Sequence, residues 1–192
     1  VNGRLLFGVF LGSDIPDCKM FFDTWNRLAA ENGLEGFHFF SLAQGQGRIN
    51  KLKGLGFDRI VTDAYSDVIK EDPFIVRKLR RLFHRPTVVS YTHYAKRSIE
   101  FFKRNNTCTP CIDPNFDHTP RSGFRGNLLQ GSTPKRWGEL CRMTKDYILQ
   151  NNDIDNLMFI KSWNEWGEGN YLEPDRRWGK AYIEETAKAL KS

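Results

Sequence analysis

The sequence has little that would place it in a membrane. None of its apolar runs approaches the ~18 residues that a membrane-spanning helix requires, and no signal-peptide pattern opens the chain. It has no initiator methionine, and Asn2-Gly3, a strong hairpin signal, has no strand before it. We therefore expect no membrane span, and we expect the chain to be the C-terminal part of a longer protein.

Cysteine is scarce, and its spacing argues against the common cysteine-based sites. Cys108 and Cys111 form a CxxC pair, whereas Cys18 and Cys141 stand alone. A structural zinc site would need a second pair, and a redox CxxC begins a helix, whereas this one opens an apolar segment. We expect Cys108 and Cys111 to be strand residues, and we expect no metal and no cofactor.

The chain is basic, but its charge is spread over several clusters. The formal net charge is +6, and the 40% of hydrophobic residues suffices for one sizeable core. Between positions 72 and 83 the apolar residues fit one face of an amphipathic helix, with the basic residues on the solvated face. No nucleic-acid-binding motif is present, so we expect no nucleic-acid partner. Attraction to anionic glycans or phosphate-linked sugars is a weaker alternative.

Strand-like and helix-like stretches alternate along the chain. The expected strands are 5–11, 36–42, 59–62, 109–113 and 157–162. The expected helices are 17–32, 72–83, 91–104, 133–151 and 177–191, with loops at 43–48 and 114–132. This alternation predicts an α/β fold of parallel βα units joined by right-handed crossovers. About five units are visible, whereas a closed (β/α)8 barrel of TIM type needs eight.

Side-chain periodicity predicts which helix faces are buried. In the first helix, capped by Ser13 or Asp14, the expected core face is Met20, Phe21, Trp25, Leu28 and Ala29. In the helix after Thr133, the expected core face is Trp137, Leu140, Cys141, Thr144 and Ile148. His38 lies inside a strand, which is typical of a core histidine whose polar atoms are satisfied.

The most informative segment follows the last strand, between positions 163 and 174. It contains Glu165 and Glu168, and glycosidic bond chemistry needs two neighbouring carboxylates, one as acid and one as base or nucleophile. The two side chains share a face only if the backbone turns between them, which Gly167 and Gly169 make easy. We interpret this segment as a sugar-processing site. The alternative for Glu168 is a rim salt bridge with Arg176 or Arg177.

Further candidate residues follow from the fold, because the carboxyl ends of parallel strands open onto one face. Around the last strand, Asn164 is a hydrogen-bond donor or a turn cap, and Trp166 and Tyr171 are sugar-stacking platforms or packing residues. Glu173 is expected to order the loop. The other candidates are Asp14, Tyr65 and an Asp117–Arg121 pair that either shapes the long loop or binds sugar.

The run from Asn164 to Pro174 resembles the WbsX-like family, glycosyltransferase-like proteins of surface-polysaccharide and O-antigen loci. That family in turn resembles glycoside hydrolase family 99, the endo-α-mannosidases. Three further stretches match the family: residues 2–3 together with residues 13–16, residues 114–121, and residues 131–134 before the penultimate helix. The resemblance covers essentially the whole chain. It implies a (β/α)8 barrel acting on glycans, of which residues 1–192 form a single catalytic-type domain covering the C-terminal half or more.

The resemblance also implies roles for the two glutamates. The position of Glu168 serves as general acid/base, and that of Glu165 assists attack by the sugar's own 2-hydroxyl through an anhydro-sugar intermediate. Gly167 stands where the endo-mannosidases have histidine, so a substrate contact is lost or replaced. Hydrolysis and transfer both remain open, as does a binding module without turnover. The resemblance implies a glycan substrate, and a cytoplasmic location if the protein serves bacterial polysaccharide biosynthesis.

Overall fold

The computed structural model describes residues 1–191 and is built on five parallel strands. They are hydrogen-bonded in the order β1-β2-β3-β5-β7. Their bounds are β1 (Leu5–Val9), β2 (Phe37–Gln44), β3 (Arg59–Asp63), β5 (Thr109–Ile112) and β7 (Phe159–Ile160). Each coincides with a predicted strand and runs parallel to its neighbours, so the expected α/β class of parallel βα units is confirmed.

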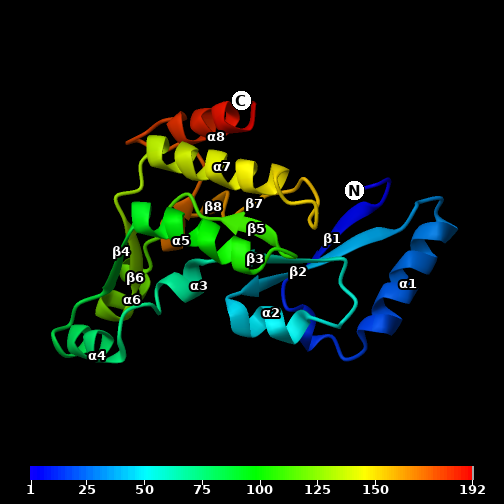
Figure 1. Ribbon diagram of the computed structural model, residues 1–192, viewed down its shortest axis with the longest axis horizontal. Helices are drawn as coiled ribbons and strands as arrows, with labels where there is room; N and C mark the ends of the chain where they lie inside the picture. Colours follow the sequence, from blue (N-terminus) through cyan, green and yellow to red (C-terminus); the bar gives the residue numbers. More distant parts are fainter. Residues whose placement is uncertain (192) are drawn as a thin grey trace.

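Helices cover the outer side of this sheet. The helices are α1 (Cys18–Glu31), α2 (Gln46–Leu52), α3 (Tyr65–Val68), α4 (Phe74–Leu82), α5 (Tyr91–Arg104), α6 (Thr119–Ser122), α7 (Pro134–Leu149) and α8 (Ala181–Lys191). Figure 1 shows α5, α7 and α8 lying side by side over the sheet, with α1 and α4 at opposite ends of the molecule. The predicted helices are all present, although α8 begins four residues later than the expected 177.

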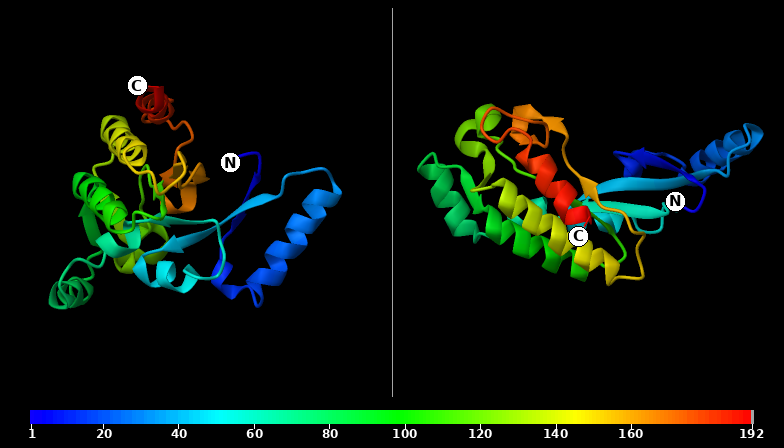
Figure 2. Two further views of the ribbon diagram at one scale, coloured as in Figure 1. Left: turned by 45° about the vertical axis from the view of Figure 1, so that its right-hand side comes forward. Right: turned by 90° about the horizontal axis from the view of Figure 1, so that it is seen from above.

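The sheet curls, so the helices fan around it as they would around part of a barrel (Figure 2). Strands β1 and β7 are its two edges. The five strands therefore form half a barrel in which all carboxyl ends lie at one end. Within the described residues, no helix is both long enough and apolar enough to cross a bilayer.

Two predicted loops contain regular structure, which corrects the sequence-based expectation. Residues 43–48 end β2 and begin α2, and residues 114–132 contain α6, a 3-10 helix η2 (Gly123–Arg125) and strand β6 (Asn127–Gln130). Strand β6 pairs in parallel with β4 (Thr87–Ser90) as a separate ribbon. Both strands have four residues, so their pairing partner, distant in sequence, decides their conformation and no local pattern predicts it.

The long helices begin at capping side chains. The side chains of Ser90 and Thr133 accept the main-chain N–H groups of His93 and Arg136 at the starts of α5 and α7. Asp17 caps α1 in the same way, with a 2.8 Å bond from the Met20 N–H. The expected caps Ser13 and Asp14 lie instead in a 3-10 helix η1 (Gly12–Asp14).

The main core lies between the sheet and helices α5, α7 and α8. The predicted core face of α7 is confirmed, since its five residues are at most 6% exposed. The predicted face of α1 is wrong in part: Met20, Trp25 and Leu28 are exposed, whereas Cys18 and Phe22 are buried with Phe39 in a second, smaller cluster. The reason is that α1 meets the sheet along a narrow strip, which buries only three of its residues.

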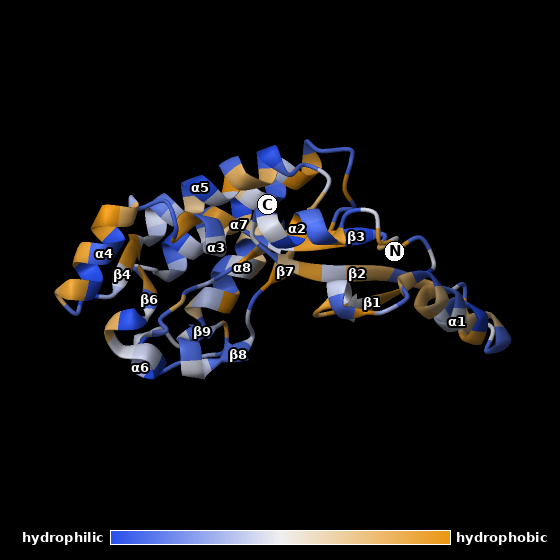
Figure 3. Ribbon diagram, turned by 90° about the horizontal axis from the view of Figure 1, so that it is seen from below, coloured by the Kyte–Doolittle hydropathy of each residue, from blue (hydrophilic) through white to orange (hydrophobic). Residues whose placement is uncertain are grey.

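Helix α4 reverses the expected orientation of an amphipathic helix. None of its residues is buried, and its large apolar side chains are exposed, whereas Arg77 and Arg80 on the other side are half-buried. Figure 3 shows hydrophobic and hydrophilic bands together on this outlying helix. Periodicity groups residues onto faces but does not say which face packs, and Asp72 pairs with Arg80 on the inner side.

Two smaller expectations concern cysteine and histidine. Cys111 lies in β5 and Cys108 immediately before it, and all four cysteines are buried free thiols. Burial raises the pKa values of the Cys108 and Cys111 thiols. His38 is a buried residue of β2, as expected of a core histidine, but its polar atoms are only partly satisfied. Its Nδ1 lies 3.1 Å from Arg4, whereas its Nε2, 3.3 Å from Asp155, has no hydrogen-bond partner in the described residues.

Candidate active site

The segment with the two glutamates forms a hairpin at the carboxyl end of β7. Strand β8 (Asn164–Glu165) pairs antiparallel with β9 (Asn170–Tyr171), and a 3-10 turn η3 (Trp166–Glu168) joins them. Gly169 closes the turn in a left-handed conformation, φ +55°, where a Cβ would lie 3.2 Å from that of Asp117. The predicted turn between Glu165 and Glu168 is therefore present.

The two glutamates have different surroundings. Glu165 is exposed at the end of β8. Glu168 is half-buried, and its Oε1 lies 3.0 Å from Nη1 of Arg121 and 3.5 Å from Nε2 of His118. Glu168 therefore does form an ion pair, as the alternative from the sequence proposed. The expected partners Arg176 and Arg177 are wrong, because the partner is Arg121. One carboxylate is open to a ligand, and the other is held by Arg121 with His118 beside it.

The long loop is attached to this hairpin through Asp117 and Arg121. The Asp117 N–H donates a 2.7 Å bond to the Glu168 carbonyl oxygen. Its carboxylate accepts the N–H and hydroxyl of Thr119 at 2.9 and 2.6 Å. The expected Asp117–Arg121 pair is therefore wrong, because Thr119 satisfies Asp117 and Arg121 is bonded to Glu168. Both residues nevertheless lie beside the hairpin.

Aromatic rings cover the outside of the hairpin. Trp166 and Tyr171 stack with ring centroids 3.8 Å apart and planes inclined by 14°. The Trp166 indole N–H donates to Glu173 at 2.7 Å, which confirms Glu173 as a loop-ordering residue. Tyr171 donates to Asp175 at 2.9 Å, and burial together with that hydrogen bond raises its pKa to about 12. Trp163 and Trp166 remain about half exposed.

Beneath the hairpin lies a buried charge cluster that the sequence analysis did not single out. Lys161, just after β7, places Nζ 2.9 Å from Asp63 and 3.3 Å from Asp113 at the ends of β3 and β5. Burial raises the pKa of Asp113, which Lys161 opposes and Asp63 reinforces. Burial would lower the pKa of Lys161, but the two aspartates outweigh it and the net direction is upward. A lysine in an otherwise apolar strand was the available signal.

Asn170 connects the hairpin to this cluster. It is 1% exposed, its Nδ2 donates to Asp113 at 3.0 Å, and its Oδ1 accepts the Ser162 N–H at 3.1 Å. Tyr94 donates to the other Asp113 oxygen at 2.6 Å, and burial followed by Asp113 raises the Tyr94 pKa. The position of the two glutamates is thus fixed from below by a fully buried hydrogen-bond network.

The remaining candidates lie at different distances from this centre. Tyr65 is buried under the site with its ring centroid 4.4 Å from that of Phe116, and its hydroxyl has no partner in the described residues. Burial, followed by Asp113, raises the Tyr65 pKa. Asn164 is exposed on β8. Asp14 accepts from Ser13 beyond β1, and no contact joins it to the other candidates in the described chain.

Comparison with known proteins adds two kinds of finding. Residues 1–186 match the glycosyltransferase WbsX family. Two uncharacterized proteins named WxcX, from two strains of Xanthomonas campestris pv. campestris, are each 26% identical over 99% of this chain. The chain spans 27% of the length of each of these relatives.

Solved structures support the fold. A glycoside hydrolase-like protein superposes with a TM-score of 0.62 at 10% identity, over the whole chain and 55% of that structure. The GH99 endo-α-mannosidase from Bacteroides thetaiotaomicron superposes with a TM-score of 0.57 at 14% identity, over the whole chain and 55% of its own length. Its complex with bis-tris propane gives 0.54 at 14% identity, over 99% of this chain and 57% of that one. Because the family match covers nearly every residue, the chain belongs to the glycosyltransferase WbsX family.

Proposed function

We propose that this chain carries the catalytic carboxylates of an enzyme that cleaves or transfers glycosyl groups on a polysaccharide or oligosaccharide. The observation that carries the proposal is the hairpin at the strand ends, which presents Glu165 and Glu168 beside half-exposed tryptophan rings. Membership of a carbohydrate-active family supports it. In this proposal residues 1–192 form one catalytic-type domain, completed to a (β/α)8 barrel by strands beyond these five.

The two glutamates take the roles that the family resemblance implies. Glu168 is the general acid/base at the glycosidic oxygen, and Glu165 assists attack by the sugar's 2-hydroxyl, giving retaining chemistry of the endo-α-mannosidase type. The exposed carboxylate of Glu165 is free to meet a ligand, whereas Glu168 exchanges its bond with Arg121 for one with the substrate. Buried Asn170 holds the hairpin in place for both steps.

Sugar binding is assigned to the exposed side of the hairpin. One face of the Trp166 ring stacks on Tyr171. The residue is about half exposed, so the other face of the ring is available to a sugar. Asn164 and Arg121 are exposed and are assigned as donors to sugar hydroxyls. Asp117 positions the loop that carries Arg121, and Tyr65 closes the floor of the site. Asp14 belongs to a more distant part of the rim.

The proposal is tested by mass spectrometry of glycans incubated with the intact protein. α-Mannan and bacterial polysaccharides are the substrates, and Glu165→Gln and Glu168→Gln are the variants. Loss of all product in both variants is expected, because each glutamine keeps the shape of the side chain but neither ionises nor transfers a proton. Glu184→Gln, an exposed change on α8, is the matched control and keeps full activity.

If no glycan releases oligosaccharide while both glutamine variants still bind sugar, the hydrolase proposal is wrong. The protein is then a transferase or a binding module. A donor screen with the same two variants then separates these, since only a transferase loses product with them. The binding module is retained as the alternative function because Glu168 forms an ion pair with Arg121.

A second prediction concerns Trp166. Removing the ring in Trp166→Ala should raise KM by about three- to tenfold with a smaller change in kcat, because stacking is made in the ground state as well as in the transition state. Trp166→Phe keeps an aromatic face and should recover most of the affinity. A fall in kcat with unchanged KM in Trp166→Ala would instead assign the ring to positioning the glutamates.

A further inference from the structure

Helix α4 has an apolar surface that nothing in the described chain covers. The surface consists of five large side chains, each between 47% and 71% exposed: Phe74, Ile75, Leu79, Leu82 and Phe83. At 100° per residue all five fall within one half of the helix circumference, with the exposed Lys78 between Phe74 and Leu82. We call this surface the α4 strip. Exposed apolar patches of this kind mark contact sites on soluble domains.

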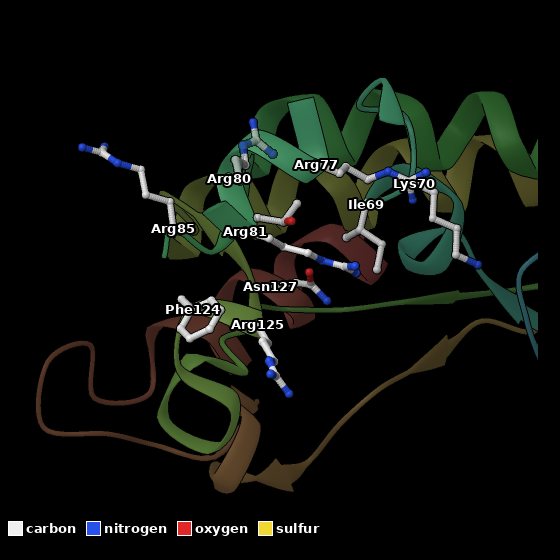
Figure 4. A pocket seen from close by; sticks show the side chains of 10 residues that line it. Ile69, Lys70, Arg77, Arg80, Arg81, Arg85, Phe124, Arg125 and Asn127 are labelled. Atoms are coloured by element: carbon white, nitrogen blue, oxygen red, sulfur yellow. The ribbon is translucent and has the colours of Figure 1, made fainter. Parts of the chain in front are cut away.

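The opposite side of α4 is strongly basic and faces the body of the protein. A cavity of about 220 Å³ separates α4 from the start of β4 and from η2, and five arginines contribute to its lining: Arg77, Arg80, Arg81, Arg85 and Arg125. Figure 4 shows the Arg81 side chain extending toward Asn127, while the Arg85 side chain extends away from both. No Asp or Glu is among its lining residues in the described chain.

The charges of this cavity are largely unpaired. Arg80 is bonded to Asp72, but the buried Nε of Arg77 has no hydrogen-bond partner in the described residues. Arg81, Arg85 and Arg125 are exposed and form no ion pair with a carboxylate of the described chain. The exposed, unpaired guanidinium groups are therefore available to an anionic partner.

We propose that the α4 strip and the adjacent arginines form a docking surface for an anionic phospholipid bilayer. An amphipathic helix of this kind lies in the membrane interface, with its apolar side chains among the acyl chains and its basic residues at the lipid phosphates. A nucleic acid or a soluble anion would use the arginines but would leave the strip exposed to water. A bilayer uses both, and that complementarity of charge and apolar surface favours it.

The position of α4 in the fold determines which end of the sheet would face a membrane. The excursion α3–α4–β4 follows the carboxyl end of β3, so it lies at the same end of the sheet as the hairpin with Glu165 and Glu168. Docking through α4 therefore brings that end of the sheet toward the membrane surface. The inference does not depend on the proposed function and stands whether or not the glutamates are catalytic.

The test is co-sedimentation of the intact protein with vesicles of phosphatidylcholine, either pure or containing about one third phosphatidylglycerol. Binding to the anionic vesicles should exceed binding to the neutral ones at least tenfold. Two double variants separate the contributions: Ile75→Asp with Leu82→Asp removes the strip, and Arg81→Gln with Arg85→Gln removes charge. Each should weaken binding about tenfold or more, since the two contributions act together. All four side chains are exposed, so the fold is retained.

Leu149→Asp is the matched control, because Leu149 is 60% exposed at the end of α7, away from α4, and should leave vesicle binding unchanged. Four outcomes overturn the proposal. The first is failure to bind anionic vesicles, and the second is unchanged binding by both double variants. The third is tighter retention of a single-stranded oligonucleotide than of vesicles. The fourth is a dimer that Ile75→Asp with Leu82→Asp converts to monomer, which would assign the strip to a second copy of the chain.

Discussion

At the residue scale, carboxylates at one end of the sheet fall into two groups with different surroundings. Glu165 and Glu168 are on the hairpin, where water or a ligand reaches them. Asp63 and Asp113 are almost fully buried, and Lys161 lies between them. A buried carboxylate is stable only with a charge or hydrogen-bond partner, so Lys161 determines whether this end of the sheet holds its structure.

Replacing Lys161 by methionine should therefore destabilise the protein strongly. Two aspartates lose their cation, and breaking a buried pair from one side costs about 3–5 kcal/mol. The free energy of unfolding by urea measures the loss. Asp113 already has a raised pKa from burial, and removing Lys161 takes away the group that opposes it. A raised carboxylate pKa gives stability that is lost as pH rises, so the stability deficit of the variant relative to the wild-type protein should be larger at pH 8 than at pH 5.

The matched control for this change is Lys188→Met, which removes an exposed pair with Glu185 on α8. The urea midpoint of that variant should not move measurably. Adding Asp113→Asn to Lys161→Met should restore part of the stability, because one buried charge is then gone. Equal stability of Lys161→Met and the wild-type protein would contradict the interpretation of Lys161 as the cation of this cluster.

At the scale of elements, regular helices were predictable and their packing was only partly so. Helix α7 combines a capping Thr133 and Pro134 with an apolar stripe that faces the sheet, so local pattern and tertiary contact agree. Helix α4 has an equally clear pattern, yet it packs with its arginines. Its orientation depends on Asp72 and on the β4–β6 ribbon, and neither is visible in the helix sequence.

The candidate site divides in the same way. The hairpin was predictable because carboxylates, aromatic rings and glycines are adjacent in the sequence between 163 and 171. The ion pair of Glu168 with Arg121 joins residues 47 apart, and the Lys161–Asp63 contact joins residues 98 apart. One charged residue at the end of each strand gives no sign of which others it meets, so these contacts require the fold.

The capping residues of α7 and α1 provide a prediction at this scale. Thr133→Ala removes the cap of a helix whose inner face is fully buried, so global stability should fall by about 1 kcal/mol. Asp17→Ala removes the cap of α1, which buries only three residues, so faster amide exchange confined to α1 should exceed the global effect. Hydrogen exchange read by mass spectrometry, beside urea unfolding, separates the two results. An equal and purely global loss in both variants would show that α1 unfolds only with the core.

At the scale of the whole molecule, a polar network ties the N-terminal strands to the segment before β7. Arg59 on β3 donates to Asp155 at 2.8 Å across 96 residues of sequence. His38 lies 3.3 Å from the same Asp155 through Nε2 and 3.1 Å from Arg4 through Nδ1. Arg4 also pairs with Asp58 at 3.0 Å. The network therefore joins parts of the chain that lie far apart in the sequence.

This network should make the stability of the whole molecule depend on pH through His38. Burial lowers its pKa; Asp58 and Asp155 oppose the shift, and Arg4 and Arg59 add to it. The unfolded chain then binds a proton near pH 6.5 that the folded chain does not, so stability is complete above that pH and falls with acid. Because a single proton is involved, the slope cannot exceed about 1.4 kcal/mol per pH unit. Urea unfolding between pH 7.5 and pH 5 should show a steeper loss in the wild-type protein than in His38→Gln. Parallel curves would instead place the acid sensitivity in other groups.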